Sequence, residues 1–181
     1  MRPMNQQMVV DALRASTEIV FSTMLGMEME SEPPYIETNP VGPSSGMIGL
    51  IGFAGAWVGS VSVTCTAAAS LRIASRMLGA ELTEIGEETL DAMSEITNMI
   101  VGGFKSEAET YLGPLGLSIP TVIYGLNFLA RSAGKEQWTV VPFLCGDEKI
   151  EVRICLTRNR GLPGLRHTGD AQDPAAALIC R

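Results

Sequence analysis

The sequence predicts an α+β fold in which a helix followed by a β-hairpin occurs twice, giving a mainly antiparallel sheet with long helices packed on one face. One observation is the helical spacing of apolar residues over 4–25 and 87–112. Another is the period of two in residues 57–66 and 149–157, which is typical of half-buried strands. A length of 181 residues, 46% of them hydrophobic, suffices for a compact domain with a real core.

The first half begins with a helix predicted from about Met4 to Leu25, where apolar residues recur at helical spacing until Gly26. A connector rich in Pro and Gly follows, with a short extended piece expected near Tyr35. The remaining elements of this half are two strands and a helix, expected at about 47–53, 57–66 and 67–78.

The second half is predicted to repeat this order. A long helix is expected at about 87–112, followed by an extended segment and two strands, at 118–128, 138–144 and 149–157. The segment DALRASTE (11–18) resembles DAMSEITN (91–98), and the alternating Val61 and Val63 match Val152 and Ile154. Two similarities in the same order favour a duplicated unit, although amphipathic helices and hairpins also resemble one another by chance.

We therefore expect one domain over residues 1–160, made of two halves at about 1–80 and 81–160. Residues 161–181 have no periodicity and are expected to form a flexible tail. The uncharged stretch between Thr38 and Arg72 could be mistaken for a membrane span. Its glycines and its alternation of Val with Ser and Thr instead indicate strands, so we predict no membrane insertion.

The composition excludes several classes of function. Only 18% of residues are charged, which argues against intrinsic disorder. The net charge is −7, which argues against a nucleic-acid binder. The four cysteines form no CxxC pair and the N-terminus lacks the apolar region of a signal peptide, so a reduced, cytoplasmic protein is expected. His167, the single histidine, lies in the tail, and no pattern of metal ligands is present.

The predicted helix at 87–112 carries two stripes. One is apolar and is expected to be buried; it contains Leu90, Met93, Ile96, Ile100, Phe104, Ala108 and Tyr111. The other lies about 150° away around the helix and contains Asp91, Glu95, Asn98, Gly102, Lys105 and Glu109. Glu95 and Asn98 are therefore expected side by side, one turn apart, on the exposed face.

Asn98, Gly102 and Gly103 are poor helix formers, since each internal Gly costs about 1 kcal/mol relative to Ala. A functional interpretation is that a bare glycine patch beside Asn98 lets another protein's backbone approach. The alternative is that the helix kinks or ends at these glycines and that Glu95 and Asn98 are ordinary solvated residues. Six acids and no base lie between Arg76 and Lys105, ending at Glu95.

The segment DAMSEITNMIVGGFK (91–105) resembles the E-x-x-N pattern of the CheX/CheC/FliY family of bacterial chemotaxis phosphatases, most closely the CheX type. A Gly follows the Asn after four residues and a base follows that Gly after three. The segments GMIGLIGFAGAWVGSVSVTCT, SLRIASRMLG and LSIPTVIYG are similar to CheX segments in the same order. The likeness covers about residues 4–157 and implies a CheC-like fold.

The resemblance implies a phosphatase that removes the phosphoryl group from the aspartate of a CheY-like response regulator. The family's catalytic Glu and Asn fall on Glu95 and Asn98, whereas the first half has Ala15 and Glu18 there and should be inactive. Asn98 would position the attacking water without repelling the phosphoryl anion. Glu95 would anchor to the active-site lysine of the regulator.

Further expectations concern partners and cofactors. Asp91, Gly102 and Lys105 are the candidate residues for additional contact with the regulator. No cofactor is expected on this chain, because the regulator's own acids would bind the Mg²⁺. The resemblance also implies a homodimer formed through edge strands.

Two other functions are weighed against this one. A CheX-like domain that binds a receiver domain or a flagellar motor component without catalysis need not keep both Glu95 and Asn98. A hydrolase of small phosphate compounds that uses Glu95 as a base is disfavoured, because the sequence has no glycine-rich phosphate loop and no metal ligands.

Overall fold

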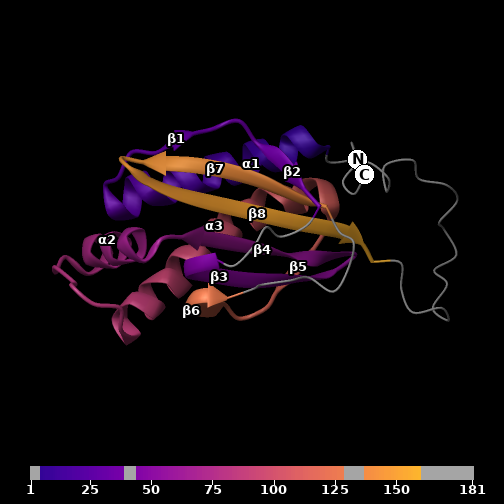
Figure 1. Ribbon diagram of the computed structural model, residues 1–181. Coiled ribbons are helices and arrows are strands. Elements are labelled where there is room, and N and C mark those ends of the chain that lie inside the picture. The colour runs from indigo at the N-terminus through magenta and orange to yellow at the C-terminus, as the bar shows by residue number, and fades with distance from the viewer. Residues whose placement is uncertain (1–4, 39–43, 129–136, 160–181) are drawn as a thin grey trace, which may run out of the picture.

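A computed structural model describes residues 5–38, 44–128 and 137–159 of the chain, and the predicted tail at 161–181 lies outside these ranges. Within them the chain forms an eight-stranded antiparallel sheet whose one face is covered by helices (Figure 1). The elements are, in chain order, α1 (Gln6–Val20), the π-helical turn η1 (Phe21–Leu25), β1 (Glu30–Ser31), β2 (Tyr35–Glu37), β3 (Ser44–Gly55), β4 (Trp57–Cys65), α2 (Ala67–Leu78), α3 (Glu87–Leu112), β5 (Leu115–Leu117), β6 (Thr121–Phe128), β7 (Trp138–Cys145) and β8 (Glu148–Arg158). The predicted fold class is confirmed.

The two long hairpins meet in the middle of the sheet, whose strand order is β1-β7-β8-β4-β3-β5. The central contact is between β4 and β8, where Val61 pairs with Ile154 and Val63 pairs with Val152. These are the four positions that the sequence comparison matched between the halves. They therefore lie next to one another at the centre of the sheet and point into the same core.

The outer strands cross from one half of the chain to the other. β1 and β2 follow α1 in the chain, but they pair with β7 of the second hairpin. β5 and β6 follow α3, but they pair with β3 of the first hairpin. Each half thus completes the sheet of the other, and the two halves share one hydrophobic core.

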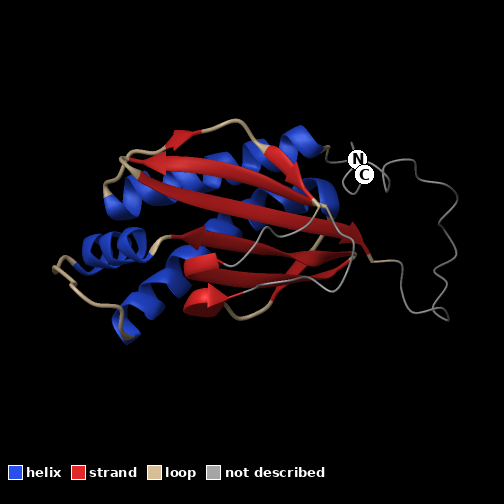
Figure 2. Cartoon of the chain, in the orientation of Figure 1, coloured by secondary structure: helices blue, strands red, loops and turns tan. Residues whose placement is uncertain are grey.

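The core lies between the sheet and the helices, which Figure 2 shows together on one side of the strands. Phe53 of β3 packs edge to face against Phe104 of α3, with ring centroids 5.9 Å apart. The opposite face of the sheet is polar on β4 and β8. It carries Ser60 and Thr64 on β4 and Glu151 and Arg153 on β8, which confirms the predicted alternation.

The helices α2 and α3 cover the predicted residues, and α2 ends at Gly79 with a left-handed φ of 65°. The first helix starts later than predicted, whereas its predicted end at Gly26 is confirmed. It begins at Gln6, because the Asn5 side chain accepts a hydrogen bond from the Met8 amide at 2.9 Å and caps the helix. Its last turn, Phe21–Leu25, is π-helical and leads into Gly26.

The extended piece expected near Tyr35 is β2, and the expected segment at 118–128 contains β6. Two short strands, β1 and β5, were not predicted. They have two and three residues, which is too short for a period of two to be recognised in the sequence.

Candidate functional site

α3 is a helix of 26 residues that passes through Gly102 and Gly103 without ending. It starts with Glu87 and Glu88 in its first turn, where the helix dipole favours negative charge. It continues to Leu112 and is capped at Gly113. The alternative that the helix ends at the glycine pair is therefore wrong, and Glu95 and Asn98 lie in its regular part.

The rotation of α3 about its axis is set by its buried stripe. Met93, Ile96, Ile100, Phe104 and Ala108 are completely buried, as predicted. Thr97 is also completely buried, and its hydroxyl donates to the Met93 carbonyl at 2.7 Å. Thr97 meets β3 at Gly49, where a Cβ atom would clash with the Thr97 side chain. This contact fixes the residue next to Asn98 against the sheet.

The opposite side of α3 presents Asp91, Glu95 and Asn98 to solvent, as predicted. Within the described part of the chain, the side chains of Glu95 and Asn98 have no hydrogen-bond or ion-pair partner. A carboxylate and a carboxamide are therefore free, one turn apart, on a rigid helix. The carboxylate of Glu95 can pair with a positively charged group of an incoming molecule. The carboxamide of Asn98 can form hydrogen bonds with that molecule without carrying a charge.

The two glycines of α3 have different surroundings. A Cβ atom on Gly102 would meet nothing within 4 Å, whereas one on Gly103 would lie 2.3 Å from the Ser16 hydroxyl. Ser16 belongs to α1, and its hydroxyl donates to the Ile100 carbonyl of α3 at 2.6 Å. Gly103 thus allows close packing against α1, whereas the space beside Gly102, four residues after Asn98, is open.

Lys105 is half-buried and forms an ion pair with Glu109, Nζ to Oε1, at 2.9 Å. The same Glu109 oxygen accepts the Leu115 amide at 2.8 Å. These two interactions, the amide hydrogen bond first, lower the pKa of Glu109. The Lys105 ammonium is therefore engaged at the end of α3, and the structure does not bring it together with Glu95.

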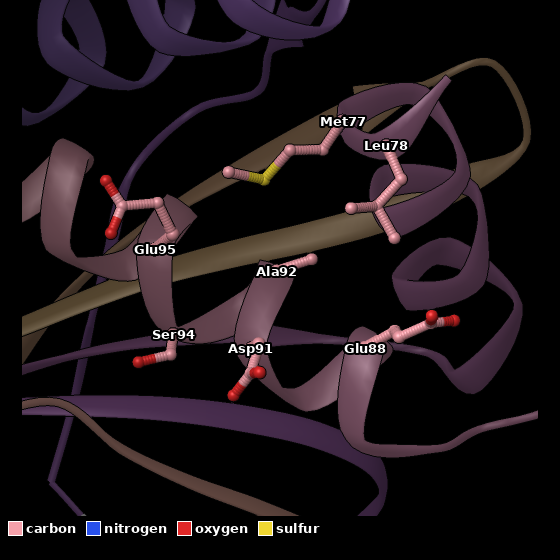
Figure 3. Close-up of a pocket in the computed structure, with 7 residues that line it drawn as sticks. All are labelled: Met77, Leu78, Glu88, Asp91, Ala92, Ser94 and Glu95. Carbon is pink, nitrogen blue, oxygen red and sulfur yellow. The ribbon is translucent and has the colours of Figure 1, made fainter. Parts of the chain in front are cut away.

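A groove of about 450 Å³ lies between the end of α2 and the first half of α3 (Figure 3). It is lined by Met77 and Leu78 from α2 and by Glu88, Asp91, Ala92 and Glu95 from α3. The sequence interpretation had singled out Asp91 and Glu95 and missed the two α2 residues. The sequence indicates these residues only through Leu78, an apolar residue directly before Gly79, where the helix ends.

Other candidate chemistry is limited in the described ranges. These residues contain no group of three or more His, Cys, Asp and Glu side chains placed to hold a metal ion. Cys65, Cys145 and Cys155 are buried, and burial raises the pKa of the Cys65 thiol to about 12, so it is protonated and unreactive at neutral pH. No helix in the described ranges is long and apolar enough to cross a membrane. His167 and Cys180 lie outside these ranges.

Comparison with known proteins identifies the fold and the family. The family described as chemotaxis phosphatase CheX matches residues 47–144, more than half of the chain. The CheY-P phosphatase CheX of Thermotoga maritima is 27% identical over 127 residues, which cover 70% of this chain and 81% of that protein.

Solved structures agree. The chemotaxis protein CheX from Vibrio vulnificus is 29% identical with a TM-score of 0.74, covering 82% of this chain and 98% of that one. The CheX of a CheX–CheY–BeF₃–Mg²⁺ complex from Borrelia burgdorferi shares the fold, with 23% identity, a TM-score of 0.67 and coverage of 82% and 97%. The predicted resemblance is confirmed: the chain belongs to the chemotaxis phosphatase CheX family.

Proposed function

We propose that this protein removes the phosphoryl group from the aspartate of a CheY-like response regulator, using Asn98 to position water and Glu95 to anchor the regulator. The observation that carries this proposal is the pair itself. Glu95 and Asn98 are exposed, one turn apart, without partners in the described part of the chain. They lie on a helix whose Thr97 is buried against Gly49 of β3.

Hydrolysis of the aspartyl phosphate needs little activation by the enzyme, because an acyl phosphate is already reactive. The water oxygen forms a bond to phosphorus while the bond from phosphorus to the aspartate oxygen breaks. The products are the aspartate carboxylate and inorganic phosphate, and a water proton is released. Catalysis then consists of holding the water in line and not opposing the charge on the phosphoryl oxygens. The neutral carboxamide of Asn98 meets both requirements.

Glu95 is unsuited to the same task, because its carboxylate would repel the phosphoryl group. It is suited to a lysine ammonium at the rim of the regulator's site. Three residues separate it from Asn98, about 4.5 Å along the helix axis. A regulator that presents a lysine and a phosphoryl group at this spacing can meet both side chains at once.

Relatives support the partner. The Thermotoga maritima protein is named as a phosphatase of CheY-P. The Borrelia burgdorferi CheX was solved in a complex with CheY, BeF₃ and Mg²⁺. We propose that Mg²⁺ belongs to the regulator, whose acids bind it, and that this chain contributes no metal ligand.

The test is the decay of a phosphorylated CheY-like receiver domain from the source organism, measured alone, with wild-type protein and with Asn98→Ala. We expect wild type to accelerate decay and Asn98→Ala to abolish the acceleration. The matched control is Glu107→Ala, which changes another exposed residue of α3 and should keep wild-type activity. No acceleration by wild type would refute the proposed activity, and binding without acceleration would favour the non-enzymatic module. Hydrolysis of a small phosphoester without receiver would favour the other alternative.

We also propose a homodimer that forms through the outer edge of β6. Within the described ranges β6 pairs only with β3, so no described strand occupies its other edge. Three large side chains near this edge, Ile123, Tyr124 and Leu126, are 37%, 43% and 74% exposed. A second copy that added its own β6 would cover them. Light scattering should give a dimer mass for wild type and a monomer mass for Leu126→Lys; a monomeric wild type at micromolar concentration would refute the dimer.

A further inference from the structure

We propose that the groove between α2 and α3 is a second contact site for the same regulator. It would receive a lysine or arginine side chain, with its aliphatic stem, from the regulator's surface beside the phosphorylated aspartate. This inference rests on the proposed function and extends it from two residues to a surface.

The floor of the groove is apolar. Leu78 is 51% exposed although it is a large aliphatic residue, and Met77 beside it is only partly buried. Figure 3 shows the Met77 side chain extending toward Glu95, while Leu78 points toward α3 at Ala92. Because Gly79 turns the chain away in a left-handed conformation, the described residues leave Leu78 uncovered. A partner's apolar atoms would therefore gain from burial here.

The rim of the groove is acidic. Glu88, Asp91 and Glu95 follow one another at intervals of three and four along α3. Within the described part of the chain no ion pair involves any of them. The helix dipole accounts for Glu88, which lies in the first turn, but not for Asp91 and Glu95 further along. Such a rim attracts a cation and repels an anion.

An apolar floor beneath a carboxylate rim matches long basic side chains in particular. Lysine and arginine bury their methylene stems along apolar surface and keep the charged end at the rim. A purely apolar partner would leave the carboxylates desolvated and unpaired, which is costly. An acidic partner would be repelled. The chemistry of the groove thus selects a basic side chain.

The groove is continuous with the proposed site. It ends at Glu95, and Asn98 lies one turn further along the same helix. From Glu88 to Glu95 the helix advances about 10 Å, at about 1.5 Å per residue. A regulator whose phosphoryl group reaches Asn98 must therefore lie beside this surface. The groove would add affinity without taking part in the bond changes at phosphorus.

The experiment uses two matched pairs of variants. Leu78→Ser removes the apolar floor, and its control Ile19→Ser changes a residue that is 60% exposed on α1. Glu88→Gln removes one rim charge, and its control Glu107→Gln removes a charge from an exposed position near the other end of α3. Each protein is titrated with a CheY-like receiver domain loaded with beryllofluoride and Mg²⁺. Dephosphorylation of the phosphorylated receiver is measured over a range of concentrations.

We expect the dissociation constant to rise about fivefold for Leu78→Ser and about threefold for Glu88→Gln. The rate at saturating receiver should stay within about twofold of wild type, since neither residue would touch the phosphoryl group. Both controls should bind as wild type does. The Glu88→Gln effect should shrink at high salt, because the interaction is between exposed charges.

Other results would overturn the inference in distinguishable ways. Unchanged dissociation constants with normal catalysis would leave the proposed function standing and remove the groove from the interface. A lower saturating rate with unchanged binding would mean that Leu78 supports α3 instead of docking the regulator. A change in the mass of the free protein with Leu78→Ser would mean that a second copy occupies the groove. If wild type neither binds nor dephosphorylates the receiver, the proposed function fails and this inference fails with it.

Discussion

The helices α1 and α3 bury and expose their residues in nearly the same pattern. Over residues 11–18 and 91–98 their exposed and buried positions follow almost the same order. Thr17 and Thr97 are both completely buried. Each donates its hydroxyl to a carbonyl one turn earlier, at 2.7 Å, that of Leu13 and that of Met93. Both helices therefore present equivalent positions to solvent.

The two helices differ at those solvent positions. Ala15 and Glu18 of α1 correspond to Glu95 and Asn98 of α3. Beyond them, α1 widens into the π-helical turn η1 and stops at Gly26, whereas α3 continues through Gly102. The two halves therefore share the residues that pack their helices. The candidate catalytic residues occupy exposed positions, where packing does not restrict the choice of side chain.

The largest effect is expected from giving α3 the residue of α1 at the second position. Asn98→Glu should reduce the rate of dephosphorylation at least about a hundredfold. The introduced carboxylate can no longer hold water beside an anionic phosphoryl group without repelling it. The variant should be no faster than Asn98→Ala, which already loses the positioning of water.

A measurement of the free energy of unfolding distinguishes this loss of dephosphorylation from misfolding. Position 98 is exposed and Ala and Glu are better helix formers than Asn, so urea denaturation should give both variants at least the wild-type free energy of unfolding. An Asn98→Glu protein that dephosphorylates the receiver at a normal rate would break the comparison, because α1 and α3 would then be equally competent.

A smaller effect is expected where the two helices touch. Gly103→Ala should lower the free energy of unfolding by about 1–3 kcal/mol, because its Cβ atom would lie 2.3 Å from the Ser16 hydroxyl. Adding Ser16→Ala should recover much of that loss, since the clashing oxygen is removed. Gly102→Ala is the matched control, and it should stabilise the helix by up to about 1 kcal/mol because no atom lies within 4 Å of the new Cβ. Equal effects of Gly102→Ala and Gly103→Ala in denaturant titrations would contradict this account.

Much of the fold could be predicted from the sequence because the periodic segments are long. The apolar stripe of α3 fixes which residues face the core, so the exposure of Glu95 and Asn98 followed from spacing alone. Gly26 and Gly79 ended their helices as expected, through left-handed φ values of 60° and 65°. The start of α1 was misplaced because the capping by Asn5 depends on a single side chain.

What the sequence could not give depends on contacts between distant segments. The pairing of β5 and β6 with the first hairpin, and of β1 and β2 with the second, joins residues that no local pattern connects. The same holds for Ser16, which bonds to α3 across 84 positions of the chain. It also holds for Leu78, whose groove exists only because α2 lies beside α3. Lys105 and Glu109, by contrast, lie four residues apart on the same predicted stripe, and their ion pair is a local helix contact.

The hairpins repeat the contrast between the helices on the open face of the sheet. By the match of Val61 with Val152, Ser60 of β4 corresponds to Glu151 of β8. Glu151 accepts from Arg153 at 2.6 Å and from Lys149 at 3.0 Å, and Arg153 also pairs with Glu37 of the first half at 2.8 Å. The second half thus has a charged cluster where the first has a hydroxyl.

This cluster gives the smallest predicted effect, a dependence of stability on pH. Burial opposes ionisation of Glu151, but the hydrogen bonds from Arg153 and Lys149 outweigh it and lower the pKa of the carboxyl. A lowered pKa in the folded state stabilises the protein above the unfolded pKa, about 4.3, and the contribution disappears as the pH falls through the folded value. Glu151→Gln should therefore cost about 1 kcal/mol at pH 7 and progressively less below pH about 4. Ser60→Ala, the matched change on β4, should have an effect that does not vary with pH in urea titrations. A pH-independent loss for Glu151→Gln would mean that the side chain stabilises the sheet by packing, as its neighbours on β4 do, and not by charge.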